Sequence, residues 1–201
     1  TLASPGIATF AGTLAATTIT IESGTAAAEN SSATVTGAIT ATTITVTGSD
    51  QAVAVGSTLT ANSTTTATTI QITGGAGGAA ATALFDANGD VTATNIIVDG
   101  GANDATATGI FQTSADVTAA IQIDDTTGEA GSMIIDSATQ AQTITGAITG
   151  VTDGDGLVSV TNTGGLVTFA SAVGTDANSL DTLTIATTAD VSFQSSVDIS
   201  D

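Results

Sequence analysis

A short β-branched phrase returns about every 25 residues along this chain, and this recurrence limits the fold more than any other feature. The phrase reads Thr-Thr-Ile-Thr-Ile at residues 17–21, and related versions begin at residues 42, 68, 94 and 119. Almost equal steps separate its central isoleucines, which are Ile19, Ile44, Ile70, Ile96 and Ile121. A fixed period of about 20 to 50 residues is typical of stacked repeats, in which each unit buries its apolar face against its neighbours.

Two further apolar positions keep the same period. The first lies four or five residues before the isoleucine and is occupied by Leu14, Ile39, Val91 and Val117, with Thr65 as the one exception. The second lies nine to eleven residues before the isoleucine and is occupied by Phe10, Val35, Leu59, Phe85 and Phe111. Because all three positions recur with the same period, we expect them to mark three stacked columns of one repeated unit.

The repeated unit has the pattern of β-strands. Apolar and polar residues alternate with period two, β-branched types dominate, and Gly, Ser, Asp and Asn bound each run. The sequence therefore predicts an all-β chain folded as a single parallel β-helix (β-solenoid) of about eight coils of about 23–26 residues. Equivalent positions of successive coils would lie about 4.8 Å apart, with isoleucine stacked on isoleucine inside and threonine outside.

Beyond residue 131 the period looks two or three residues shorter. Steps of about 23 residues would place Ile134 after Phe111, Ile144 after Ile121, and Val167 after Ile144. Four further strands are expected, at residues 157–160, 166–169, 183–185 and 191–193.

We divide the chain into residues 1–7, an N-terminal lead or inter-subunit strand, and residues 8–201, the solenoid. The alternative fold is a β-sandwich completed by a donated strand, for which residues 1–10 with their single Pro5 are the candidate. A sandwich does not require the repeat period, so the solenoid is preferred.

Composition excludes several functions. The chain has nineteen Asp and Glu but no Lys, Arg, His, Cys, Tyr or Trp. Without basic side chains it cannot neutralise phosphate, which argues against nucleic acid and anionic membranes as partners. The sequence contains no run of eighteen apolar residues, so it does not predict a membrane-spanning helix. Because the usual neutral-pH bases and the thiol and amine nucleophiles are also missing, we do not expect an enzyme.

The acidic residues are concentrated in the second part of the chain, since sixteen of the nineteen lie from Asp86 onward. Many occupy Gly-rich turns, where carboxylate, amide and backbone oxygens can supply the ligands that calcium prefers. The candidate calcium ligands are Asp86, Asn88, Asp90, Asp99, Asp104, Asp124, Asp125, Asp153 and Asp155. Calcium is the one cofactor that the sequence suggests. The alternative is that these residues are simply those that β-turns use.

Threonine forms a short outward ladder in the same repeats. Thr18-x-Thr20 and Thr43-x-Thr45 are two rungs that resemble the flat threonine arrays of ice-binding β-solenoids. The next rungs contain Gln71, Ile97 and Gln122, so the pattern disfavours ice binding.

The repeated phrases resemble those of bacterial surface proteins. Thr-Ile-Thr-Ile and Gly-Ala-Ile-Thr, the latter at residues 37–40 and 146–149, occur with Ala-, Thr-, Gly- and Asp-rich turns and few aromatic residues. This pattern is similar to the repeat regions of haemagglutinin-type adhesins, autotransporter passengers and some surface-layer proteins. The Gly-Gly-x-Gly-x-Asp unit of calcium-binding nonapeptide repeats does not occur. The resemblance implies a structural protein at the cell surface.

A solenoid has an open strand edge at each end, and isolated solenoids usually cover these edges with a cap. The repeat here begins at Phe10, and strand-like sequence continues to Ile199, so we expect no cap. Two uncapped ends favour head-to-tail stacking into a homopolymer. The expected function is a self-assembling extracellular filament or surface-layer subunit whose partner is itself. The alternatives are a stalk segment of a large adhesin and a donor-strand pilus subunit.

Overall fold

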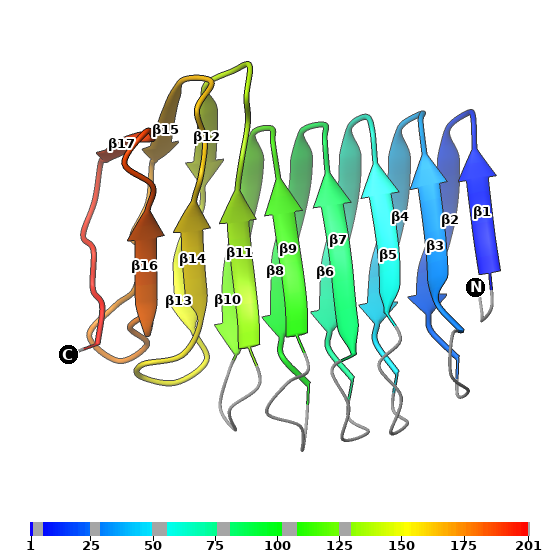
Figure 1. Cartoon of the computed structure of the whole chain (residues 1–201), viewed down its shortest axis with the longest axis horizontal. Coiled ribbons are helices and arrows are strands. Elements are labelled where there is room, and N and C mark those ends of the chain that lie inside the picture. The colour runs from blue at the N-terminus through cyan, green and yellow to red at the C-terminus, as the bar shows by residue number, and fades with distance from the viewer. Residues whose placement is uncertain are drawn as a thin grey trace.

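The chain folds into two parallel β-sheets that face each other (Figure 1). This computed structural model describes residues 1, 6–24, 29–49, 56–75, 81–101, 108–124 and 130–200. In these residues the regular elements are all strands, and every strand pairing is parallel, so the predicted all-β parallel solenoid is confirmed. None of these residues belongs to a helix of the length and hydrophobicity needed to cross a membrane.

The strands alternate between the two sheets along the chain. Sheet 1 has eight strands in the order β1 (Gly6–Phe10), β3 (Ser31–Val35), β5 (Ser57–Ala61), β7 (Thr82–Ala87), β9 (Thr108–Thr113), β11 (Ala130–Ile135), β14 (Leu157–Val160) and β16 (Thr182–Ile185). Sheet 2 has nine strands, which are β2 (Leu14–Glu22), β4 (Ile39–Thr47), β6 (Thr65–Thr73), β8 (Val91–Asp99), β10 (Val117–Asp124), β12 (Gln142–Thr145), β13 (Ile148–Gly150), β15 (Leu166–Phe169) and β17 (Asp190–Phe193). Each coil contributes one strand, or one broken strand, to each sheet.

The alternative β-sandwich is wrong, because its sheets would be antiparallel. Residues of the proposed donor segment instead form β1, which pairs in parallel with β3 of the same chain. This first strand starts at Gly6, two residues before the expected start of the solenoid.

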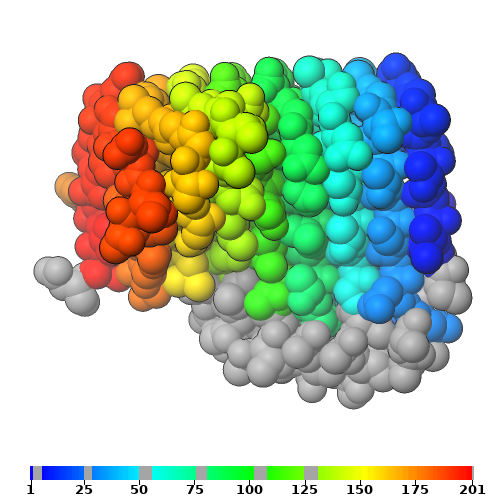
Figure 2. Space-filling view, turned by 45° about the horizontal axis from the view of Figure 1, so that its top comes forward, coloured from blue at the N-terminus to red at the C-terminus, as the bar shows by residue number. Residues whose placement is uncertain are grey.

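The solenoid has about six turns, so the expected number of about eight was slightly too high. Two shorter strand pairs, β14–β15 and β16–β17, continue the sheets beyond the regular turns, and each of their strands has only four residues. Figure 2 shows the coils as successive bands along the long axis of the molecule.

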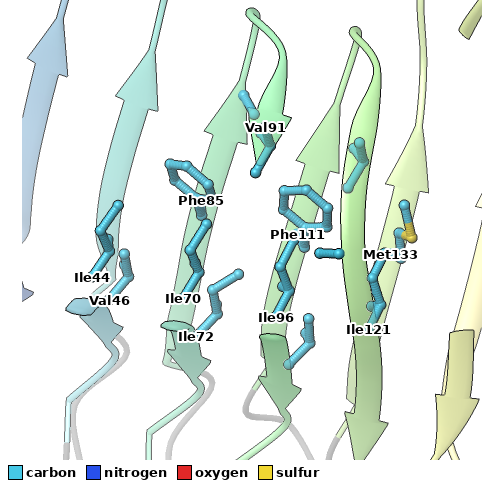
Figure 3. Close-up of a cluster of buried hydrophobic side chains, with 14 of the residues drawn as sticks. Ile44, Val46, Ile70, Ile72, Phe85, Val91, Ile96, Phe111, Ile121 and Met133 are labelled. Carbon is cyan, nitrogen blue, oxygen red and sulfur yellow. The ribbon is translucent and has the colours of Figure 1, made fainter. Parts of the chain in front are cut away.

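Apolar columns fill the space between the sheets. The isoleucine column continues as predicted through Ile19, Ile44, Ile70, Ile96 and Ile121, all of them buried. Figure 3 shows side chains of both sheets meeting in this core. Phe85 and Phe111 stack on neighbouring coils, with ring centroids 5.9 Å apart and ring planes at 16°.

The predicted column that began at Phe10 is wrong, because in the structure its residues belong to two different columns. Phe10 lies in register with Val35, and the positions that follow are Ala61 and Ala87. Leu59, Phe85 and Phe111 lie two residues earlier in their strands, in register with Ala8 and Ala33. Successive inward positions of a strand are two residues apart, so both columns are apolar and their periods look alike.

The expected stacking partners after Ile121 were also wrong. Met133 follows Phe111, one position earlier than the expected Ile134. Ile148 follows Ile121, four positions later than the expected Ile144.

Two short strands explain the longer step to Ile148. In sheet 2 the partner of β10 is divided into β12 and β13, and Ile144 of β12 pairs with Val117 and Phe169. Val167 therefore does not follow Ile144. The four later strands lie where the sequence predicts them, within one residue.

Thr65, the exception in the first apolar column, lies inside the core. Only 1% of its surface is exposed, and its hydroxyl has no hydrogen-bond partner. It occupies the same column as Ile39 and Val91. A buried hydroxyl without a partner carries a desolvation cost of about 1–3 kcal/mol.

We therefore expect Thr65→Val to raise the free energy of unfolding by about 1–2 kcal/mol, because valine has the same shape and no hydroxyl. Urea denaturation followed by circular dichroism measures the change. Thr66→Val is the matched control, since Thr66 is exposed and should change stability by less than about 0.5 kcal/mol. A Thr65→Val protein less stable than the wild type would contradict this account of the column.

Candidate functional site

The first coil leaves the core open at one end of the solenoid. We call the free side of β1 and β2 the leading edge, because among the residues that the structure describes each of these strands has a partner on one side only. Phe10 is 40% exposed, and Leu14 is only partly buried. A mainly apolar cavity of about 170 Å³ opens here, and its lining includes Phe10, Leu14, Ala16, Ile19, Ile21 and Leu59.

The last coil leaves the core open at the opposite end. We call the free side of β16, β17 and Val197 the trailing edge. Ile185 and Val197 are each 41% exposed, while Leu183 and Phe193 are partly buried against the core. Phe193 stacks on Phe169 of the preceding coil, with ring centroids 5.1 Å apart. In Figure 1 the two edges lie at opposite ends of the long axis.

The same columns reach both edges. In sheet 1 one column runs from Ala8 to Leu183 and the next from Phe10 to Ile185. In sheet 2 the pairings connect Leu14 with Phe193 and Ile19 with Val197. The two edges therefore present equivalent positions of one repeating pattern.

Both edges carry little charge. The four strands β1, β2, β16 and β17 contain two acidic residues, Glu22 and Asp190. Proteins commonly protect edge strands with charged residues, prolines or bulges, because unpaired strand edges recruit further strands. Apolar and nearly uncharged edges of this kind favour association.

The first group of predicted calcium ligands follows β7. Asn88 lies in a ladder across three coils, in which its amide donates to Oδ1 of Asn62 (3.1 Å) and its Oδ1 accepts from the hydroxyl of Ser114 (3.3 Å). Asp90 accepts a hydrogen bond from the backbone amide of Asp116 at 3.3 Å. Both side chains therefore connect successive coils.

Asp86 borders a polar surface groove of about 410 Å³. Gln112 of the next coil also lines this groove. Its side-chain amide donates a hydrogen bond to a carboxylate oxygen of Asp136, one coil further, at 2.9 Å. Burial raises the pKa of Asp86 above its usual value, and the negative charge of Asp136 raises it further, while hydrogen bonds from Asn88 and Thr60 oppose the shift.

The other described candidate ligands lie toward the opposite end of the strands, where Asp99 and Asp124 end β8 and β10 and where Asp153 and Asp155 follow β13. Asp99 and Asp124 lie in register on neighbouring coils, and Asp99 accepts from the amide of Gly101 at 2.8 Å. Asp155 is buried and accepts from the amide and the hydroxyl of Thr152 at 2.7 and 2.9 Å. Asp153 accepts from the hydroxyl of Ser179.

Asp104 and Asp125 lie outside the described residues. Within the described ranges no three acidic side chains gather closely enough to hold a metal ion. Calcium binding stays a prediction.

Sequence reasoning missed an array of threonines on the outer face of sheet 2. One line of threonines, which we call the first file, consists of Thr40, Thr66, Thr92, Thr118 and Thr145. These residues are exposed and in register on five successive coils. Two residues further along the strands, Thr17, Thr42, Thr68 and Thr94 are also exposed, at the position where the pairing between neighbouring strands is interrupted. The even spacing of Thr40, Thr66, Thr92 and Thr118 is visible in the sequence and is the signal that could have revealed the first file.

Comparison with protein-family models, with curated proteins and with solved structures finds no match to this chain.

Proposed function

We propose that this chain is a self-assembling structural module that stacks end to end into an extracellular filament or surface layer. One observation carries the proposal: the same apolar columns are open at both the leading and the trailing edge. The likeness of the repeat phrases to bacterial surface proteins supports the location.

Stacking continues the pattern that already joins one coil to the next. The leading edge of a second copy places its β1 beside β16 and its β2 beside β17, all in parallel. Phe10 of the second copy then lies over Ile185, and its Leu14 lies over Phe193. Full burial of one large apolar side chain contributes about 1.5–3 kcal/mol, and backbone hydrogen bonds along both sheets add specificity.

The geometry of this contact leads to a filament rather than a closed ring. The two edges are different surfaces, so the contact is heterologous and leaves one edge of each kind free at the ends of the assembly. Successive copies are related mainly by a translation along the solenoid axis, which allows growth to continue.

Charge sets the conditions for assembly. The chain carries a formal net charge of −19, but only three of its acidic residues precede Asp86. The leading half of one copy therefore meets the acidic half of the next with less repulsion than two acidic halves would. Salt or divalent cations should promote stacking by screening the remaining repulsion.

A test uses one charged substitution at each edge. We expect the wild type to sediment as long polymers in about 0.15 M salt, and Phe10→Asp and Ile185→Asp each to abolish polymers, because a carboxylate cannot be buried in the stacked core. Ile97→Asp is the matched control, since Ile97 lies partly exposed on the outer face of the central strand β8, in register with the uncharged Gln71 and Gln122 and remote from both edges. This control should polymerise like the wild type.

Mixing the two edge variants gives a sharper result. Phe10→Asp keeps an intact trailing edge and Ile185→Asp keeps an intact leading edge, so an equimolar mixture should form dimers that cannot extend. Analytical ultracentrifugation distinguishes monomer, dimer and polymer. A wild type that stays monomeric at high concentration with salt and calcium would overturn the proposal, as would equal loss of assembly in Ile97→Asp.

A further inference from the structure

Asn88 and Gly89 lie in the turn between β7 and β8, on a central coil of the solenoid (Figure 1). The chain has seven asparagines, and Asn88 is the only one that a glycine follows. Glycine is needed here because the turn packs closely on the preceding coil, where a Cβ atom on Gly89 would overlap the backbone of Ser63. The stacking of the coils therefore explains why this turn contains an Asn-Gly pair.

The backbone nitrogen of Gly89 is available for reaction. Within the described ranges its N–H donates no hydrogen bond, although the neighbouring N–H of Asn88 donates to the carbonyl of Ala61 at 2.8 Å. The Asn88 side chain is exposed to water, and Gly89 has no side chain that would hinder its nitrogen. Asn162 differs, because it is buried and the N–H of the following Thr163 donates to a backbone carbonyl at 3.0 Å.

The side-chain amide of Asn88 is held between two coils. Its nitrogen donates to Oδ1 of Asn62 at 3.1 Å, and its oxygen accepts from the hydroxyl of Ser114 at 3.3 Å. Asn62 and Ser114 occupy the equivalent turn positions of the preceding and the following coil. A donor at the amide oxygen stabilises the negative charge that develops there when a nucleophile attacks the carbon. Ser114 is therefore placed to assist such an attack.

We propose that Asn88 is a modification site, where the side-chain amide converts spontaneously to a carboxylate through a cyclic imide with Gly89. The Gly89 nitrogen gives its proton to a base in the solvent and bonds to Cγ of Asn88, while the charge on Oδ1 is stabilised by Ser114. The bond from Cγ to Nδ2 then breaks, and this nitrogen takes a proton from water and leaves as ammonia. A second water opens the ring at either carbonyl, which leaves aspartate or isoaspartate. Overall one water is consumed and one ammonia is released, without oxidation or reduction.

The new carboxylate weakens the contact between coils. The hydrogen-bond donor to Asn62 is lost, so two oxygen atoms face each other where an amide and a carbonyl met before. A carboxylate oxygen of Asp86 lies 3.5 Å from the same nitrogen, so the new negative charge also faces an existing one. The reaction adds one negative charge to the formal net charge of −19. This inference does not depend on end-to-end stacking, because the turn is remote from both edges.

The test follows each asparagine in the same sample. Wild-type protein is kept in mildly alkaline buffer, and samples taken over time are denatured, digested with pepsin in acid and analysed by peptide mass spectrometry. Asn62 is the internal control, since it has the same turn position but is followed by Ser63. We expect the Asn88 peptide to gain one mass unit at least about tenfold faster than the Asn62 peptide, because glycine leaves the attacking nitrogen unhindered. No conversion at Asn88, or equal rates at both asparagines, would overturn the proposal.

The contribution of Ser114 is tested with two variants. Ser114→Ala removes the hydroxyl and should slow the conversion of Asn88 several-fold, whereas Ser114→Thr keeps a hydroxyl and should convert at the wild-type rate. Circular dichroism checks that both variants keep the wild-type fold. Equal rates in the wild type and in both variants would show that Ser114 does not assist the reaction.

Melting temperatures test the effect on the fold. Asn88→Asp mimics one product, and Asn62→Asp adds the same charge but still offers an acceptor to the Asn88 amide. We expect Asn88→Asp to melt below Asn62→Asp, and the wild type to shift toward the melting temperature of Asn88→Asp as its Asn88 peptide converts. Equal melting temperatures for the two variants would overturn the predicted loss of contact between coils.

Discussion

Replacing Phe111 by alanine is expected to lower the free energy of unfolding by about 3–5 kcal/mol, the range observed for large aromatic side chains deleted from a packed core. Phe111 is fully buried, stacks on Phe85 at 5.9 Å, and lies in register with Met133 on the next coil. The cavity therefore interrupts a column between two coils, where no other element can move in to fill it. Urea denaturation followed by circular dichroism measures the loss.

Position along the solenoid decides the size of this effect. In a stacked repeat each coil is stabilised mainly by its two neighbours, so a defect in a central coil weakens two interfaces. Phe10→Ala is the control, because Phe10 is 40% exposed at the leading edge and has a neighbouring coil on one side only. We expect it to cost less than about 1.5 kcal/mol in the monomer, below the range for a buried aromatic side chain. Similar losses for Phe10→Ala and Phe111→Ala would show that the central column is not closely packed.

The second large effect is expected at Gly146, where alanine should destabilise the protein by about 2 kcal/mol or more. Its φ of +114° is a conformation that side chains strain, and such strain costs about 1–3 kcal/mol. A Cβ atom would also clash with the carbonyl oxygen of Ala119 on the preceding coil. The turn and the neighbouring backbone both have to move before alanine fits.

Gly12→Ala is the matched control for Gly146→Ala. A Cβ atom on Gly12 would have no other atom within 4 Å, so this substitution should leave the melting temperature nearly unchanged or raise it slightly. Thermal melting of both variants measures the difference. An unchanged melting temperature for Gly146→Ala would mean that the turn before Ile148 does not have this conformation.

Gly146 also shows where repeated phrases mislead. The phrase Gly-Ala-Ile-Thr occurs at residues 37–40 and 146–149, and both glycines lie against the backbone of the preceding coil. The two isoleucines, however, belong to different columns. Ile39 lies beneath the threonine array and pairs with Leu14, while Ile148 continues the column of Ile121. Identical phrases thus occupy different parts of a coil.

The candidate site was predictable only in outline. Exposed strand edges follow from any open solenoid, and the sequence predicted them. Which side chains reach the edges required the register, because it connects Phe10 with Ile185 and Leu14 with Phe193 over the whole length. The acidic turns were evident as a group, but their hydrogen bonds between coils, such as that from Asp116 to Asp90, depend on which turns lie side by side.

The amino-acid sequence alone was enough to predict the class of fold, the direction of stacking and the isoleucine column. These follow from a period of about 25 residues and from alternation within each strand, and both are local properties that every repeat expresses again. The three-dimensional structure was needed to assign residues to columns, to show how the longer coil between Ile121 and Ile148 is accommodated, and to place the evenly spaced Thr40, Thr66 and Thr92 on the exposed face. Because turns absorb changes in coil length, the spacing between residues does not fix the exact position of a residue in its strand. In a strand a shift of one position moves a side chain from the core to the solvent.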